Sequence, residues 1–431
     1  MFFKDNVNYE VKAFVMFQIP GLSGRIYPPK LAGKYYPNGI PLIDESELEE
    51  FVKRNNVEEA ILAFSDLTYS ELGHIISRVL ALGLDFKILG PKTTMIKSSK
   101  PILAIAAVRT GSGKSSLTRL ISLELLKMKL KFAVVRHPMV YGEFEKAVVQ
   151  EFREFSDLER YNVTVEEAEE YTWYIEHKIP VYAGIDYKKI LRILEEKYDV
   201  IIWDGGNNDW PFYEPDYLVV VADALRPGQE IASYPGEVNV RQANLIVINK
   251  VNVAPKENIT MIINNIRKIN REAKIALAES RIKVDNPELI RGRRVLVIED
   301  APTVTHGQAP YGAGYIAAKM YKAKEVIDPR PYAKGIIKDI LEKYKHMKEV
   351  LPSIGYNRRQ LLDLEETINN IPCDTIILAT PAPLERMIRI KKPIVRVSYE
   401  MKLVNYSVRQ IIAEFLKNAI KHGKSKPSKI V

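Results

Sequence analysis

Residues 105–116 constrain the fold most tightly, because an apolar strand there runs into a glycine-rich turn and then a helix. The turn carries Gly111 and Gly113, and Lys114 opens a helix whose apolar face begins at Leu117. Glycines let backbone N–H groups point at phosphate oxygens, the helix N-terminus adds partial positive charge, and a lysine here reaches the terminal phosphates of a nucleotide. The segment therefore predicts a P-loop, with a nucleotide-binding set of Gly111, Ser112, Gly113, Lys114, Ser115 and Ser116.

Segments typical of strands alternate with helical patterns along most of the chain. This alternation predicts an α/β fold built on a parallel sheet that is covered on both faces. Helices are expected at 70–84 and at 46–55, where Ser46 and Glu49 have the spacing of a capping box. The expected strands are residues 11–16, 60–64, 86–89, 102–108, 132–136, 200–203, 217–222, 245–249, 294–299 and 375–379.

A polar run that ends at Pro101 marks a boundary between two expected domains. Residues 1–97 predict a Rossmann-like α/β domain that starts at the helix after its first strand. Residues 101–402 predict a P-loop NTPase domain. Residues 403–431 predict an amphipathic helix at 408–420 and a basic tail, which we interpret as solvated.

The strand at 200–203 ends in Asp204, which is followed by two glycines and a polar loop. A strand-ending carboxylate beside a P-loop holds Mg²⁺ directly or through water, and the serine after the P-loop lysine supplies a hydroxyl to the same ion. We therefore predict Asp204 and Ser115 as metal ligands and Mg²⁺ as a cofactor. Asn207 and Asn208, in the loop after Asp204, are predicted substrate ligands.

Asn249 and Lys250 close the strand at 245–249, and Asn252 follows two residues later. An aspartate at that last position would read guanine, whereas an asparagine amide offers both a donor and an acceptor. We predict Asn249 and Lys250 as nucleotide-binding residues. ATP is the expected co-substrate, with GTP as the alternative.

Basic side chains at other strand ends predict a site for an anionic small-molecule substrate, because ligands gather at the carboxyl ends of parallel strands. Two sets of residues follow from this placement and from the P-loop. The predicted substrate ligands are Arg136, His137, Arg226, Arg241 and His306, and the predicted catalytic residues are Lys114, Asp204, Arg109, Arg136 and His137.

Composition narrows the classes of partner. The net charge of +9 suits anionic ligands, but no helix-turn-helix, zinc-finger or RNA-binding pattern is present, so no nucleic acid is expected. The chain has no run of about 18 uncharged apolar residues, so no membrane span is expected. The N-terminus lacks the pattern of a signal peptide. Cys373 is the single cysteine, which excludes a disulfide framework. We expect a cytoplasmic homo-oligomer with no membrane partner.

Five segments together resemble the cyclic 2,3-diphosphoglycerate synthetase family, whose relatives include predicted P-loop GTPases. They are the P-loop at 107–115, Val-Arg-His-Pro-Met at 135–139, Trp-Asp-Gly-Gly-Asn-Asn-Asp at 203–209, and the segments 298–307 and 328–332. The resemblance extends from about residue 9 to about residue 400.

The resemblance implies a ligase that uses ATP to close a phosphoanhydride ring within 2,3-diphosphoglycerate, releasing ADP and phosphate. In that reaction Lys114 and Mg²⁺ would neutralise charge on the transferred phosphoryl group. Arg109, Arg136, His137, Arg226 and Arg241 would hold the substrate phosphates. The alternative is a GTPase-type switch that regulates a partner protein and makes no small-molecule product, and a third hypothesis is a non-catalytic nucleotide sensor.

Overall fold

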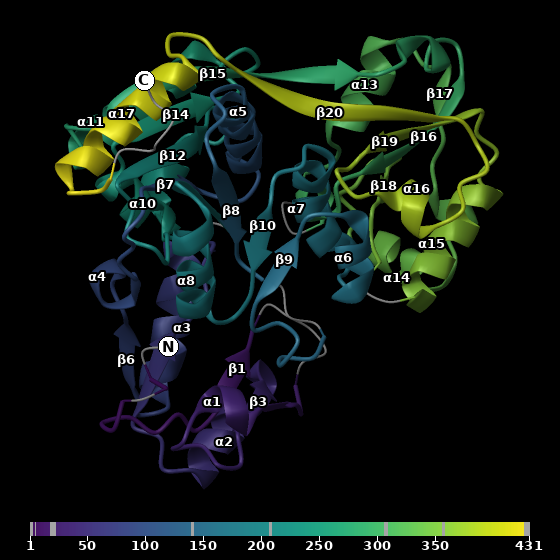
Figure 1. Ribbon diagram of the computed structural model, residues 1–431. Coiled ribbons are helices and arrows are strands. Elements are labelled where there is room, and N and C mark those ends of the chain that lie inside the picture. The colour runs from purple at the N-terminus through teal and green to yellow at the C-terminus, as the bar shows by residue number, and fades with distance from the viewer. Residues whose placement is uncertain are drawn as a thin grey trace.

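The computed structural model describes residues 3–4, 6–17, 23–138, 142–206, 209–305, 309–355 and 358–425 (Figure 1). Within these residues, 13 strands join in one mixed sheet, whose order is β17-β16-β19-β20-β15-β14-β12-β7-β11-β8-β10-β9, with β18 paired to β16. This sheet confirms the predicted α/β class. No helix of the described residues is long and apolar enough to cross a membrane.

The first half of the large sheet, with the helices packed on it, is called here the P-loop lobe. Its strands are β7 (Ile102–Ala107), β8 (Phe132–Arg136), β9 (Gln150–Phe152), β10 (Val181–Ala183), β11 (Val200–Gly205), β12 (Tyr217–Asp223) and β14 (Leu245–Asn249). Its main helices are α5 (Lys114–Lys127), α6 (Phe155–Arg160), α7 (Val165–Glu176), α8 (Tyr187–Lys197), α9 (Gln229–Ala232), α10 (Gly236–Gln242), α11 (Lys256–Ile269) and α17 (Val408–Lys421).

The central strands of this lobe are apolar along most of their length because both faces of the sheet are covered. Along β7, Leu103 and Ile105 pack with α5, α7 and α17 on one face. Ile102 and Ala104 pack with α8, α10 and α11 on the other. The period of two along the strand thus divides one apolar run between two hydrophobic cores.

The second half of the sheet, called here the C-lobe, has a separate hydrophobic core. Its strands are β16 (Arg294–Glu299), β17 (Glu325–Val326), β18 (Leu351–Pro352) and β19 (Thr375–Ala379). Its helices are α12 (Ala301–Val304), α13 (Ala313–Met320), α14 (Gly335–Lys343), α15 (Arg358–Asn370) and α16 (Leu384–Met387). The region 101–402, predicted as one domain, therefore contains more than one core.

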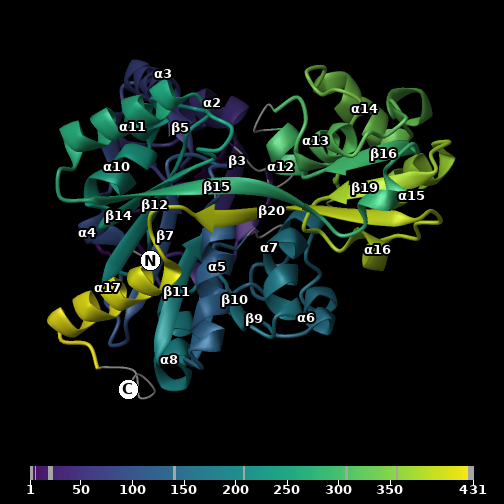
Figure 2. The same ribbon diagram turned by 90° about the horizontal axis from the view of Figure 1, so that it is seen from above.

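Two long strands carry the sheet from one lobe to the other, as Figure 2 shows. β15 (Lys274–Val284) pairs in parallel with β14 at its start and antiparallel with β20 (Ile394–Leu403) along its second half. β20 pairs in parallel with β19 of the C-lobe. Helix α7 also touches both lobes, because Val165 joins the C-lobe core while Tyr171 and Tyr174 join the P-loop lobe.

The described residues before position 97 form two small sheets and not the single sheet of a Rossmann-like domain. β3 (Ile40–Asp44) pairs in parallel with β1 (Phe14–Met16) and antiparallel with β2 (Ile26–Tyr27). β4 (Glu59–Leu62) pairs in parallel with β6 (Asp85–Ile88). The short strand β5 (Leu67–Thr68) pairs antiparallel with β13 (Ser233–Tyr234), which ties this segment to the P-loop lobe. The remaining helices here are α1 (Pro29–Ala32), α2 (Leu48–Arg54), α3 (Tyr69–Ala81) and α4 (Pro91–Thr94).

Prediction of individual elements succeeded where the apolar runs are buried. β8, β14, β16 and β19 match the predicted ranges residue for residue. The predicted capping box of Ser46 and Glu49 is wrong, because Asp44 caps the preceding 3-10 helix with Glu47 as its reciprocal partner. The sequence analysis did not predict β15 and β20. The second halves of these strands alternate polar and apolar residues and are only partly buried.

Candidate nucleotide and substrate site

The glycine-rich loop adopts the conformation that its sequence requires. Gly111 and Gly113 have φ values of 82° and 108°, in the left-handed region that favours glycine. A Cβ on Gly113 would lie 2.3 Å from Nδ2 of Asn249, so only glycine fits there. Helix α5 begins at Lys114, directly after this turn. The predicted strand, loop and helix are therefore confirmed.

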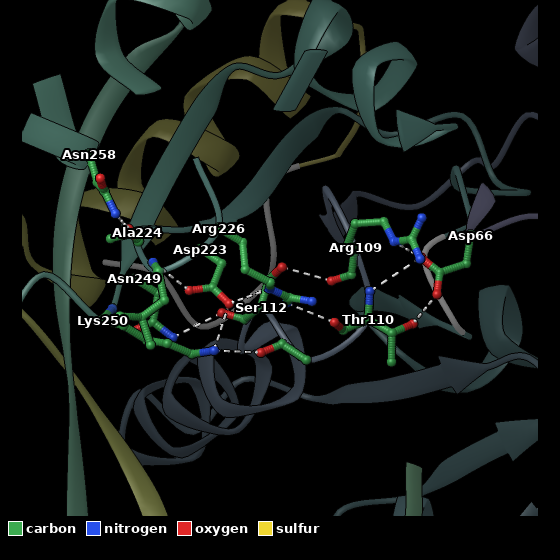
Figure 3. A network of polar contacts seen from close by, with 12 residues as sticks. Asp66, Arg109, Thr110, Ser112, Asp223, Ala224, Arg226, Asn249, Lys250 and Asn258 are labelled. Carbon is green, nitrogen blue, oxygen red and sulfur yellow. Dashed lines mark hydrogen bonds and ion pairs between the residues drawn. The ribbon is translucent and has the colours of Figure 1, made fainter. Parts of the chain in front are cut away.

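Three successive carbonyl groups of the loop, from Thr110 to Ser112, accept hydrogen bonds from side chains at the ends of other strands (Figure 3). In order along the loop, the donors are Arg226 Nη2 at 2.8 Å, Lys250 Nζ at 3.0 Å and Asn249 Nδ2 at 2.9 Å. A peptide unit points its N–H opposite to its carbonyl. Fixing the carbonyls on one side therefore turns the N–H groups toward the place where phosphates bind in such loops.

Asp223 organises two of these donors. Its Oδ2 accepts hydrogen bonds from Arg226 Nε at 2.8 Å and from Lys250 Nζ at 2.7 Å, and the side chain is buried at the end of β12. Arg226, predicted as a substrate ligand, is thus placed as a support of the P-loop. Asn258 lies at the edge of the network and donates to the carbonyl of Ala224 at 3.0 Å.

Asp204 is the penultimate residue of β11, and its carboxylate accepts four hydrogen bonds beside the P-loop. One oxygen accepts from Lys114 Nζ at 2.9 Å and Thr118 Oγ1 at 2.7 Å, and the other from Tyr174 at 3.0 Å and from Arg136. Burial acts to raise the pKa of Asp204, but the positive charges of Arg136 and Lys114 outweigh it and lower the pKa to about 2. Asp204 is therefore ionised, as a site for cations requires.

The residues around Asp204 fit Mg²⁺ in donor chemistry. An ionised carboxylate and the Ser115 hydroxyl are hard oxygen donors of the kind this ion prefers. Among the described residues, no group of three or more His, Cys, Asp or Glu side chains could hold a metal by itself. Mg²⁺ usually binds through one or two protein oxygens together with nucleotide phosphates. Burial also lowers the pKa of Lys114, whose ammonium is held near Asp204.

Arg136 connects the P-loop lobe to helix α7. Its guanidinium is buried between Asp204 and Glu170, with an ion pair to each carboxylate. Glu169, the residue before Glu170 on α7, turns toward the C-lobe. It accepts hydrogen bonds from Ser353 Oγ at 2.9 Å and from Thr380. Adjacent glutamates on α7 thus reach strand ends in different lobes.

A second carboxyl group, that of Asp300, contacts Glu169 at the strand ends of the C-lobe. Asp300 follows β16 and hydrogen-bonds to Glu169, while Ser353 follows β18 and Thr380 follows β19. Burial and then the charge of Asp300 raise the pKa of Glu169 well above its ordinary range, and burial likewise raises the pKa of Asp300. Because two close carboxylates repel each other, the protonated form of this pair is favoured over the doubly ionised form.

Glu299, at the end of β16, is bound by the first turn of α13. Its oxygens accept backbone N–H bonds from Gly312 at 3.0 Å, Gly314 at 3.2 Å and Tyr315 at 2.8 Å. Burial raises the pKa of Glu299 to about 7 against the effect of these donors. The contact fixes α13 against the edge that carries Asp300.

The other predicted cations differ in their placement. Arg109 forms an ion pair at 3.2 Å with Asp66, which also accepts from Thr110 Oγ1 at 2.8 Å. Arg241 lies on α10, is 53% exposed and pairs with Glu237 four residues before it, away from these contacts. The predicted substrate ligands Asn207, Asn208 and His306 lie outside the described residues.

Asn252 is turned toward β15. Its Nδ2 donates to the carbonyl of Ser280 at 3.0 Å and its Oδ1 accepts from the backbone N–H of Ser280 at 2.9 Å. The amide that was predicted to face the base therefore pairs with a strand backbone, although the residue itself is exposed.

Sequence reasoning missed Asp66, Glu169, Asp223 and Asp300. Asp223 ends a buried strand just as Asp204 does, so the same signal could have identified it. Asp300 lies in one of the segments that carry the family resemblance, but an aspartate at this position did not by itself indicate a function. Glu169 sits in a helix rich in acidic residues, and no local pattern separates it from Glu170.

Comparison with known proteins defines the family. A family model described as "Cyclic 2,3-diphosphoglycerate synthetase, P-loop domain" matches residues 186–278. The chain is 49% identical over 422 residues to a protein named arginine synthetase ArcE from Thermococcus kodakarensis, covering 98% of this chain and 94% of the relative. The chain belongs to the cyclic 2,3-diphosphoglycerate synthetase family. It is a P-loop enzyme of the synthetase type, as the sequence predicted.

Two further proteins match this chain over different lengths. A cyclic 2,3-diphosphoglycerate synthetase from Thermococcus sibiricus is 30% identical over 104 residues, which is 24% of each chain. Among solved structures, LpxK from Aquifex aeolicus, in complex with ATP, covers 80% of this chain and 96% of its own at 13% identity and a TM-score of 0.49. In this family the arginine synthetase is thus similar to the present chain across both lobes, whereas the similarity to the diphosphoglycerate enzyme is local.

Proposed function

We propose that this chain is a nucleotide-dependent synthetase whose product is arginine. The observation that carries the proposal is the 49% identity to the arginine synthetase, which extends over 98% of the chain and so includes the P-loop lobe and the C-lobe together. Similarity over a P-loop alone would leave the second substrate open, because that loop serves many reactions.

The charge distribution supports a substrate that is not strongly anionic. Arg136 is neutralised by Asp204 and Glu170, and Arg226 is paired with Asp223. A bisphosphate carries several negative charges and needs cations that are still available to it. The strand ends of the C-lobe instead gather carboxyl groups and hydroxyls, which suit the ammonium and ureido groups of an amino acid.

The chemistry follows from what a P-loop site can supply. Arginine forms from the corresponding ureido amino acid, citrulline, when an oxygen on the ureido carbon is replaced by nitrogen. The γ-phosphoryl group of ATP can be transferred to that oxygen, which makes it a leaving group, and ammonia can then displace phosphate. Lys114 and the loop N–H groups would hold the triphosphate in place. Glu169 and Asp300 would hold the cationic end of the amino acid.

A second candidate is the ring closure on 2,3-diphosphoglycerate that the sequence analysis predicted, with release of ADP and phosphate. The match of residues 186–278 to the family's P-loop domain favours it. In that case Arg136, Arg226 and Arg241 would have to leave their carboxylate partners to bind the substrate. A nucleotide switch would instead hydrolyse GTP slowly with no small-molecule product.

One assay separates these functions. The enzyme is incubated with Mg²⁺ and either ATP or GTP, alone, with citrulline and ammonium, or with 2,3-diphosphoglycerate, and arginine, cyclic product and phosphate are measured by mass spectrometry. We expect arginine and phosphate in equal amounts only with citrulline and ammonium, and no product with Lys114→Ala. Cyclic product would support the second candidate, and GTP hydrolysis that no small molecule stimulates would support the switch.

A further inference from the structure

The imidazole of His137 lies just beyond β8, on the opposite side of the sheet from Arg136. The backbone N–H of His137 donates to the carbonyl of Gly205 at 3.2 Å, which holds this residue beside the strand that ends in Asp204. The ring lies against the edge of Phe212, with centroids 5.6 Å apart. His137 therefore stands at the same carboxyl edge of the sheet as the P-loop and the Asp204 carboxylate.

Two oxygen atoms face Nδ1 of this ring. The hydroxyl of Tyr187 on α8 lies 3.1 Å away and Oδ2 of Asp209 lies 3.5 Å away. Because a carboxylate can only accept a hydrogen bond, its presence favours the proton on Nδ1. That tautomer leaves the lone pair of the imidazole on Nε2. Within the described parts of the chain, no hydrogen bond engages Nε2, and the side chain is 41% exposed.

The position of Asp209 is itself fixed. Its Oδ1 accepts from Ser65 Oγ at 2.6 Å, and its backbone carbonyl accepts from Asn239 Nδ2 at 3.4 Å. Gly206 passes so close that a Cβ there would lie 2.7 Å from Cβ of His137 and 2.9 Å from Oδ2 of Asp209. Asp209 and His137 are therefore packed around a glycine that allows them to approach each other.

The segment that holds Asp209 also holds the P-loop. Ser65 contacts Asp209, and the next residue, Asp66, contacts both Arg109 and Thr110. Asp66 has a φ of 63°, which turns its side chain toward the loop at this position. Residues 65 and 66 thus contact both Asp209, which lies beside the imidazole, and the start of the P-loop.

We propose that His137 is the general base of the nitrogen-transfer step, with Asp209 as the residue that positions it. This proposal rests on arginine formation as the proposed function. A carboxylate that orients an imidazole through Nδ1 while Nε2 takes a proton is a recurrent catalytic arrangement. The charged and titratable groups that face the ring are Asp209, from the loop after β11, and Tyr187, from α8.

The step balances as follows. Ammonia attacks the carbon of the phosphorylated ureido group, and the π electrons of its C=N bond move onto that nitrogen until phosphate leaves. The new C–N bond leaves a positive charge on the incoming nitrogen. His137 Nε2 takes one proton from that nitrogen. The C–O bond to the phosphoryl group then breaks, and phosphate leaves with the electron pair. The imidazolium returns its proton to solvent, and the negative charge of Asp209 stabilises it in the interval.

The test uses ATP labelled with ¹⁸O in the bridge between the β- and γ-phosphates. Transfer of the phosphoryl group to citrulline and its return scrambles this label without ammonia, so scrambling reports the first step alone. We expect His137→Gln to keep citrulline-dependent scrambling within about threefold of wild type. Its rate of arginine formation should fall about 10²-fold or more, with partial rescue by added imidazole. His74→Gln, an exposed histidine on α3, is the matched control and should match wild type in both rates.

Asp209 provides a second variant. We expect Asp209→Asn to lower arginine formation about tenfold and to shift the pH profile of that step, while Asp209→Glu restores part of the rate. A His137→Gln enzyme that makes arginine at the wild-type rate, or that loses scrambling and ATP binding together with arginine, overturns the assignment of His137 as base. A wild-type enzyme that forms no arginine overturns both this proposal and the proposed function, so the two failures are distinguishable.

Discussion

The P-loop lobe and the C-lobe each bring buried carboxyl groups to the carboxyl ends of parallel strands, yet the pKa values of the two sets are shifted in opposite directions. Asp204 has Arg136 and Lys114 against it, and its pKa lies near 2. Glu169 and Asp300 have hydroxyl donors and each other, and their pKa values are raised. Burial acts in the same direction in both lobes, so the neighbouring charges decide the outcome.

This difference suggests a division of tasks. The P-loop lobe keeps a permanently ionised carboxylate next to cations, which is the arrangement needed to organise a metal ion and phosphates. The C-lobe keeps a buried carboxyl pair whose pKa values are raised, an environment that favours a bound proton or a positively charged ligand. Helix α7 links the two, since Glu170 faces Arg136 while Glu169 faces Asp300 and Ser353.

The largest expected effect is on the stability of the P-loop lobe. Arg136→Ala leaves Asp204 and Glu170 without their shared buried cation, and should lower the free energy of unfolding by about 3–5 kcal/mol. Chemical denaturation measures this loss. Arg409→Ala removes an arginine that is 78% exposed and paired with Glu124, and should change stability by less than about 1 kcal/mol. If Arg136→Ala is as stable as that control but needs far more substrate, Arg136 is a substrate ligand, as first predicted.

The next effect concerns catalysis with little change of stability. Lys114→Ala should lower the rate of nucleotide cleavage about 10²-fold or more, equivalent to about 2.7 kcal/mol of transition-state stabilisation. Asp204 keeps Arg136, Thr118 and Tyr174 as donors in this variant, so the fold should remain intact. Steady-state phosphate release is the measurement. Lys127→Ala, on the same helix and 70% exposed, should retain the wild-type rate.

The C-lobe pair should make stability depend on pH. A carboxyl group whose folded-state pKa exceeds its unfolded value binds more protons when folded, so its contribution to stability is lost as pH rises through the folded-state pKa. Glu169→Gln removes one carboxyl and keeps an acceptor for the hydroxyls. Between pH 5 and pH 8 we expect this variant to lose less stability than wild type, because it lacks the group whose pKa is raised on folding.

Urea denaturation at several pH values measures that difference. Glu299, whose pKa is raised to about 7, contributes to the slope in both proteins and cancels in the comparison. An unchanged slope in Glu169→Gln would show that the pair is ionised, and the contrast between the lobes would then disappear.

The smallest effect is expected for Arg241→Ala. Arg241 pairs with Glu237 one helical turn away on α10, and the arginine side chain is 53% exposed. Such pairs stabilise a helix by about 0.3–0.5 kcal/mol, so we expect a change of that size in stability and substrate kinetics within about twofold of wild type. A large rise in KM for the substrate other than the nucleotide would indicate that Arg241 binds this substrate. That result would strengthen the case for an anionic substrate.

The sequence by itself determined the P-loop and the buried strands, because both depend on neighbouring residues. A glycine turn between an apolar strand and a helix has few alternative structures, and a continuous apolar run of five or six residues must be covered on both sides. Lys114 and Asp204 were predicted in this way, and in the structure Nζ of Lys114 lies 2.9 Å from Oδ1 of Asp204. Asn249 and Lys250 were predicted as nucleotide-binding residues, and in the structure their side chains donate hydrogen bonds to the P-loop backbone.

Only the tertiary structure decided which charges are neutralised. Glu169 meets Ser353 and Thr380 across 184 and 211 residues of sequence, a separation over which no local pattern can act. Arg136 looks like a phosphate ligand at the end of its strand until α7 brings Glu170 against it. An electrostatic interaction depends on distance and burial in space, and the sequence supplies only the residue types. The charge and protonation state of each lobe therefore emerge only once the helices and strands are packed together.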